Sequence, residues 1–167
     1  MGEHKFTKHF KNNLTDNLNE LFEQNEYELI AESEFSVPSF YGRNAIDIGI
    51  YSKKDVSKIV GIEIEFVSCQ KQITINRDKF RNWVNNSKYR SGGLLHIICA
   101  DAKITQNKLY ELLIHSYEEM STGREFYYEF FALKEFDRRE TQYTAQYILE
   151  DWEFDARLFS LLHKVFF

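Results

Sequence analysis

The segment "AIDIGIYSKKDVSKIVGIEIEFVS", residues 45 to 68, contains two apolar, alternating runs on either side of the polar turn "KKDVS". This pattern predicts a β-hairpin with strands over 45–52 and 58–68. Acids interrupt both runs, since Asp47 lies in the first and Glu63 and Glu65 lie in the second. Carboxylates seldom occupy buried strands unless they are paired or bound to a cation, so these acids need a partner.

The two faces of this hairpin differ in composition, because strand side chains alternate between faces. One face is apolar, and we expect it to be buried; it consists of Ile46, Ile48, Ile50, Ile62, Ile64 and Phe66. Asp47, Glu63 and Glu65 are then expected together on the opposite face. Gly49 and Gly61 share that face and are expected to leave room beside the acids.

The sequence before residue 101 predicts helices and strands around this hairpin. Apolar residues at helical spacing predict a helix over 5–24, and partial alternation predicts a strand over 26–37. A second helix is predicted over 73–86, ended by "SGG" at 91–93. The continuous apolar run at 94–100 is typical of a central strand that is buried on both faces.

The sequence after residue 101 predicts further helices and strands. We expect a helix over 105–120, a strand over 125–133 and a closing helix over 151–167 with Asp151 near its cap. Residues 141–149 fit a strand or a helix equally well. The whole chain, 1–167, is expected to form a single α/β domain: a mixed β-sheet flanked by helices, followed by a C-terminal extension over 102–167.

Composition limits the function classes. A chain of 167 residues with 43% hydrophobic residues can bury a sizeable core, and its net charge of -5 argues against a general nucleic-acid coat. The two cysteines match no zinc or disulfide spacing. The polar N-terminal sequence lacks a secretory signal, and no apolar run is long enough to span a bilayer. We therefore expect a cytoplasmic protein that does not bind membranes.

Three neighbouring carboxylates repel one another, and burial adds a desolvation cost. A divalent cation removes both penalties, and ligands that are all oxygen favour Mg²⁺ or Mn²⁺ over zinc. Such an ion can orient and acidify an attacking water and offset charge on a leaving oxygen. The alternative is a solvated sheet face, because antiparallel sheets often expose one side to water.

The order helix, three strands, helix, strand, with Asp47 followed after 15 residues by Glu63-Ile64-Glu65, resembles the PD-(D/E)xK phosphodiesterase superfamily. The resemblance covers residues 5–101 and implies a restriction-endonuclease-like αβββαβ core. It implies that Asp47, Glu63 and the main-chain carbonyl of Ile64 hold Mg²⁺ or Mn²⁺. Many members also use a glutamate of the first helix, for which Glu20 is the candidate.

Two residues depart from the family pattern. The proline before the aspartate is Ile46 here, and the lysine of the motif is Glu65. By the resemblance, Glu65 would orient or deprotonate the attacking water, or hold a second ion. Alternatively, a lysine arrives from the following helix, with Lys79 as the first candidate and Lys71 as the second.

Residues 70–90 form a basic segment in this acidic chain, with six basic residues and one acid. The expected nucleic-acid-binding residues of the segment are Lys71, Gln72, Asn76, Arg77, Arg81, Lys88 and Arg90. Such a charge excess directly after the acid pair suits a phosphate backbone. The alternative is that it forms a solvated helix face.

These patterns predict a Mg²⁺-dependent nuclease that hydrolyses phosphodiester bonds, with DNA as the expected substrate. Two other hypotheses remain open at this point. One is a nuclease fold that has lost catalysis and binds nucleic acid or a protein partner. The other is an unrelated α+β interaction domain whose acids face water. The excess of aromatic residues after 125 also suggests a homodimer surface.

Overall fold

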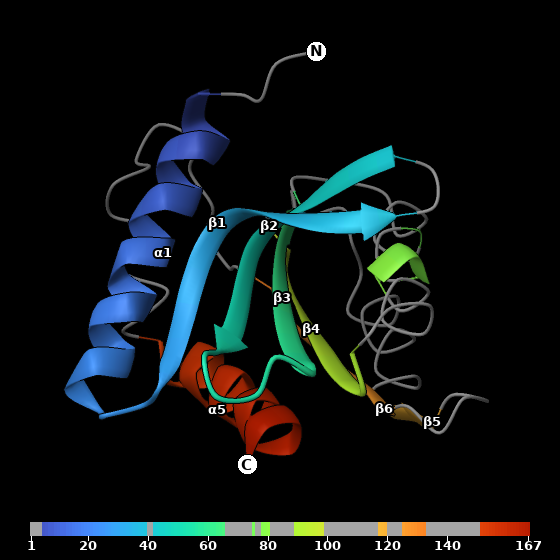
Figure 1. The fold of residues 1–167 in the computed structure, drawn as a ribbon. Helices are drawn as coiled ribbons and strands as arrows, with labels where there is room; N and C mark the ends of the chain where they lie inside the picture. The colour runs from blue at the N-terminus through green and yellow to red at the C-terminus, as the bar shows by residue number, and fades with distance from the viewer. Residues whose placement is uncertain are drawn as a thin grey trace.

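The computed structural model describes residues 5–39, 42–65, 75, 78–80, 89–98, 117–119, 125–132 and 151–167. In this part of the chain the protein is an α/β domain, in which helices near the two ends flank a mixed sheet (Figure 1). The helices are α1 (Lys5–Gln24) and α5 (Trp152–Phe166). The strands are β1 (Leu29–Ser39), β2 (Gly42–Ser52), β3 (Lys58–Glu65), β4 (Ser91–Ile98), β5 (Tyr117–Glu119) and β6 (Glu125–Ala132).

The described strands form one six-stranded sheet in the order β1-β2-β3-β4-β6-β5. Strands β1, β2 and β3 pair antiparallel, so the predicted hairpin is confirmed. Strand β4 pairs parallel with both β3 and β6, and β5 pairs antiparallel with β6. A parallel β3–β4 pair requires a crossover between them, and residues 75 and 78–80, which lie in that connection, are helical.

Two sequence-based expectations are wrong. The segment "SGG" at 91–93 does not end a helix but opens β4. A Cβ on Gly93 would come 2.7 Å from Cδ1 of Leu161, so this glycine allows α5 to approach the strand. Residues 117–119 form β5 instead of the end of a helix. The predictions for 105–116 and 141–149 fall outside the described residues.

Helices α1 and α5 share one face of the sheet. Helix α1 packs on β1 and β2, whereas α5 packs on β3, β4 and β6. Their apolar stripes and the inward side chains of the strands form a single buried cluster, which includes Phe10, Leu14, Leu18, Phe22, Ile48, Ile50, Ile62, Leu95, Ile97, Phe154, Leu158 and Leu161. Helix α5 begins where expected, because the Asp151 carboxylate accepts a hydrogen bond from the Glu153 N–H at 2.8 Å.

On the open edge of strand β1, a side chain of α1 hydrogen-bonds the main-chain groups of Ala31. Asn19 of α1 donates its amide to the Ala31 carbonyl at 2.9 Å, and its Oδ1 accepts from the Ala31 N–H at 2.8 Å. One asparagine thus makes both bonds that a neighbouring strand would make to Ala31. Open strand edges promote pairing with other chains, so this contact both anchors α1 and blocks the edge at that residue.

We expect Asn19→Ala to lower the free energy of unfolding by about 1–3 kcal/mol, because it leaves two main-chain groups of the buried residue Ala31 without these bonds. Denaturant unfolding followed by circular dichroism measures the change. Asn12→Ala, at an exposed site on the same helix, is the control and should change stability by about 0.5 kcal/mol or less. Equal effects of the two substitutions would contradict the role of Asn19.

Candidate active site

Strands β2 and β3 part at the acids. Their pairing runs from Tyr51 with Ile59 to Ile48 with Ile62 and then ends. Beyond it, side chains make the cross-strand bonds. The Ile64 N–H donates to Oδ2 of Asp47 at 2.8 Å, and the Asp47 N–H donates to Oε1 of Glu63 at 3.3 Å.

These bonds hold the two carboxylates between the diverging strands. Asp47 binds the backbone of β3 while Glu63 binds the backbone of β2, so each acid fixes the strand that carries the other. Both side chains are half-buried, and that of Asp47 is 22% exposed. A hydrogen bond from a main-chain N–H favours the charged form of a carboxylate. The sequence therefore places two oriented acids at one opening in the sheet.

A third member of this site, Lys11 of α1, was not predicted from the sequence. Its Nζ lies 3.9 Å from Oδ1 of Asp47 and 3.0 Å from Oε1 of Glu34, and its side chain is only 3% exposed. The signal was present, since Lys11 stands three residues before Leu14 and seven before Leu18, on the buried stripe of the helix. A lysine on an inward stripe requires an acid across the core.

Glu34 lies opposite Asp47 in the sheet, between the pairs Ser33 with Ile48 and Phe35 with Ile46. Its φ of 50° is in the left-handed region, which is unfavourable for residues other than glycine. A strained backbone conformation of this kind persists where surrounding contacts hold the residue in it. Here the ion pair with Lys11 is one such contact.

The glycines do not leave space beside the acids as expected. A Cβ on Gly49 would lie 2.5 Å from Cγ of Phe35, and one on Gly61 would lie 2.6 Å from Cε2 of Phe80. Aromatic rings therefore fill these positions. The Cδ1 atom of Ile46 also lies 3.2 Å from a Cβ on Gly61, so Ile46 packs on the glycine face and not with the isoleucines of the opposite face. The parting of the strands next to Asp47 explains the change of face.

Histidine 96 lies beside Glu63, because the two residues are partners in the parallel β3–β4 pairing. His96 is fully buried, and its Nδ1 is 2.6 Å from the hydroxyl of Tyr128, which is also fully buried. The polar residues Asp47, Glu63, His96 and Tyr128 thus come from four neighbouring strands. This polar row is a result of strand order that spacing along the chain did not reveal.

The structure does not bring every predicted residue to the acids. Glu20 is exposed and lies nine residues from Lys11 on α1, a distance of about 13 Å along the helix axis. Lys79 is exposed beside Phe80, whose ring lies on Gly61. Arg90 bonds the Ser57 hydroxyl at the opposite end of β3.

The remaining predicted residues are outside the structural description. The main chain of Glu65 belongs to β3, but its side chain is not among the described ones. Six residues of the basic segment lie entirely outside the described residues: Lys71, Gln72, Asn76, Arg77, Arg81 and Lys88.

The donor chemistry of Asp47 and Glu63 suits a hard cation. Among the described side chains, no cluster of three or more His, Cys, Asp or Glu residues is arranged to hold a metal ion. Magnesium is commonly bound through one or two carboxylates, with water and substrate phosphate completing its octahedron. The carboxylate oxygens of the two acids are therefore donors of the kind that Mg²⁺ and Mn²⁺ prefer.

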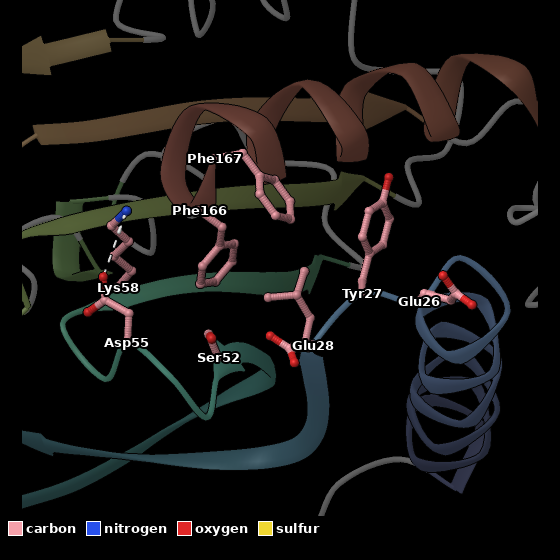
Figure 2. A pocket seen from close by; sticks show the side chains of 9 residues that line it. Glu26, Tyr27, Glu28, Ser52, Asp55, Lys58, Phe166 and Phe167 are labelled. Atoms are coloured by element: carbon pink, nitrogen blue, oxygen red, sulfur yellow. Dashed lines mark ion pairs between the residues drawn. The ribbon is translucent and has the colours of Figure 1, made fainter.

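A pocket of about 240 Å³, drawn in Figure 2, lies beside Ser52 at the C-terminal end of β2, five residues after Asp47. It is lined by Glu26, Tyr27, Glu28, Leu29, Ser52, Asp55, Lys58, Phe166 and Phe167. At its rim, the Ser57 hydroxyl and N–H both donate to Oδ1 of Asp55. These bonds, with Lys58 and Arg90 nearby, lower the pKa of the Asp55 carboxyl. This arrangement stabilises the β2–β3 turn.

Comparisons with known proteins add no relative. No family model, no curated protein and no solved structure matches the chain. No described helix is long and apolar enough to cross a membrane.

We expect Gly49→Ala to lower the free energy of unfolding by about 1–3 kcal/mol, because its Cβ would overlap the base of the Phe35 ring. Chemical denaturation measures the change. In a Phe35→Gly background the same substitution should cost less, because both the ring and the Phe35 Cβ, which lies 2.7 Å from the added Cβ, are gone. An undiminished cost in that background would contradict the packing of Phe35 on Gly49.

The lowered pKa of Asp55 predicts a pH dependence. A carboxyl with a folded-state pKa below its ordinary value of about 3.9 adds stability above that value, which is lost as the pH falls through the folded-state pKa. Asp55→Asn should therefore be less stable than wild type at pH 6, and the difference should shrink below about pH 4. Urea unfolding across this range measures it. A difference that stays constant with pH would contradict the assignment.

Proposed function

We propose that this protein is a divalent-cation-dependent nuclease of the restriction-endonuclease-like type that hydrolyses phosphodiester bonds in DNA. The observation that supports the proposal most is the bonded pair Asp47 and Glu63, whose carboxylates bridge two parting strands. A solvated sheet face would not require acids that replace main-chain pairing. The order α1, β1, β2, β3, β4, with helical residues at 75 and 78–80 between β3 and β4, is compatible with the same proposal.

The proposed mechanism relies on preorganised acids. Main-chain N–H groups fix the orientation of Asp47 and Glu63 before substrate arrives, so little reorganisation is needed when charge develops. Bound between these carboxylates and the Ile64 carbonyl, Mg²⁺ would acidify a water and offset charge on the phosphate. Glu65 follows Glu63 by two residues on β3 and is the candidate to orient the attacking water. Lys11 supplies positive charge from the helix side of Asp47.

The proposed partner surface includes the basic segment at 70–90, which begins five residues after Glu65. Positive side chains there would bind phosphates next to the acids and increase affinity at low salt. Arg90 is a weaker member of that surface, since it bonds Ser57, six residues before Glu63 and about 20 Å away along β3. A homodimer remains a further proposal from the aromatic excess.

A second function is a binding module that has lost catalysis. Two observations favour it: Glu65 replaces the lysine of the motif, and Lys11 already neutralises part of the charge on Asp47. Such a protein would bind DNA without cleaving it.

We expect Asp47→Asn and Glu63→Gln each to reduce Mn²⁺ affinity and to reduce DNA cleavage at least about 100-fold, because each removes a charged metal ligand but keeps the side-chain shape. Calorimetry measures Mn²⁺ binding, and cleavage of single- and double-stranded DNA in Mg²⁺ and Mn²⁺ measures turnover. Circular dichroism shows whether the variants remain folded.

The matched controls are Asp16→Asn and Glu23→Gln, which make the same charge changes at exposed positions of α1. They should leave both readouts unchanged. Cleavage that survives in Asp47→Asn or Glu63→Gln would reject the assignment. Binding of DNA by wild type without cleavage, at any cation concentration, would favour the inactive module.

A further inference from the structure

Lys11 of α1 is a buried ionisable residue that contacts the proposed cation site without being one of its ligands. Its side chain is 3% exposed, yet its ammonium faces two carboxylates from two different strands. An isolated buried ammonium is strongly unfavourable, so a lysine in this position must have its charge compensated by acids nearby. Two such acids among the described residues are Glu34 at 3.0 Å and Asp47 at 3.9 Å.

The two contacts differ in strength and in exposure. Glu34 makes the shorter contact, and its side chain is 61% exposed, whereas that of Asp47 is 22% exposed. Glu34 therefore keeps much of its hydration while it bonds Lys11. The attraction of Lys11 for Asp47 is screened less by water than its attraction for Glu34, because the Asp47 side chain is the less exposed of the two.

We propose that Lys11 is the internal counter-ion of the Asp47–Glu63 pair, and that Glu34 positions it. This inference rests on the proposed cation site. Without a divalent cation, Lys11 lowers the repulsion between the two carboxylates at the opening between β2 and β3. With a cation bound, Lys11 competes with it for Asp47, and its charge is then balanced by Glu34.

The backbone of Glu34 agrees with a positioning role. Its left-handed φ of 50° occurs opposite Asp47, between the paired residues Ser33 and Phe35 of β1. The cost of this conformation is met by contacts that include the 3.0 Å ion pair. Strand β1 thereby contributes to the site through Lys11, without providing a metal ligand itself.

The first experiment measures stability in EDTA, and it needs no metal. Lys11→Met keeps the length of the side chain and removes the charge. We expect it to lower the melting temperature by about 2–4 °C in the wild-type background and by clearly less in the Asp47→Asn background, where one of the charges it balances is absent. Lys8→Met, at an exposed position of α1, should have no effect in either background. Equal losses in both backgrounds would overturn the counter-ion role.

The second experiment measures Mn²⁺ affinity by electron paramagnetic resonance of the free ion. Lys11→Met should tighten Mn²⁺ binding about three- to tenfold, because a competing charge is gone. Glu34→Gln should weaken it, because Lys11 then has Asp47 as its remaining charged partner among these acids. A purely structural lysine would not tighten binding when removed, so unchanged or weaker binding in Lys11→Met would overturn the proposal.

The two proposals fail in different ways. If neither wild type nor any variant binds Mn²⁺ or cleaves DNA, the nuclease proposal is rejected, and the melting comparison alone decides the counter-ion role. If Mn²⁺ binds only in Lys11→Met, the counter-ion role is supported. If wild type binds Mn²⁺ and Lys11→Met lowers the melting temperature by the same amount in both backgrounds, the cation site stands and the counter-ion role is rejected.

Discussion

Two strands that part must give their main-chain groups new partners, and in this protein the partners are the acids Asp47 and Glu63. The pairing of β2 with β3 stops at Ile48 and Ile62, and the next two cross-strand bonds use carboxylates. Each bond joins a side chain on one strand to the backbone of the other. The site and the end of the hairpin are therefore one structure.

The same opening accounts for the unusual features around it. Ile46 changes face, so that its side chain reaches Gly61, and Phe35 covers Gly49 after the left-handed residue Glu34. Lys11 then meets Glu34 and Asp47 from the helix layer. These contacts come from α1, β1, β2 and β3, which explains why the site depends on how the layers pack.

Local patterns predicted much of this arrangement. Helical spacing of apolar residues placed α1 at 5–24, and alternation placed the hairpin and therefore Asp47 and Glu63 on facing strands. Patterns with a weak local signal failed: "SGG" opens β4, and residues 117–119 are a strand at the edge of the sheet. Glycine and short segments at an edge are governed by what packs against them, as Leu161 packs on Gly93.

The sequence by itself determined α1, α5, the pairing of the hairpin and the two acids within it, because alternation and helical periodicity are properties of consecutive residues. Only the tertiary structure decided that Lys11 and Glu34 join Asp47, that His96 lies beside Glu63, and that aromatic rings fill the space at Gly49 and Gly61. The physical reason is that these contacts join residues from different layers and non-adjacent segments. Their energies depend on burial and distance, which spacing along the chain does not encode.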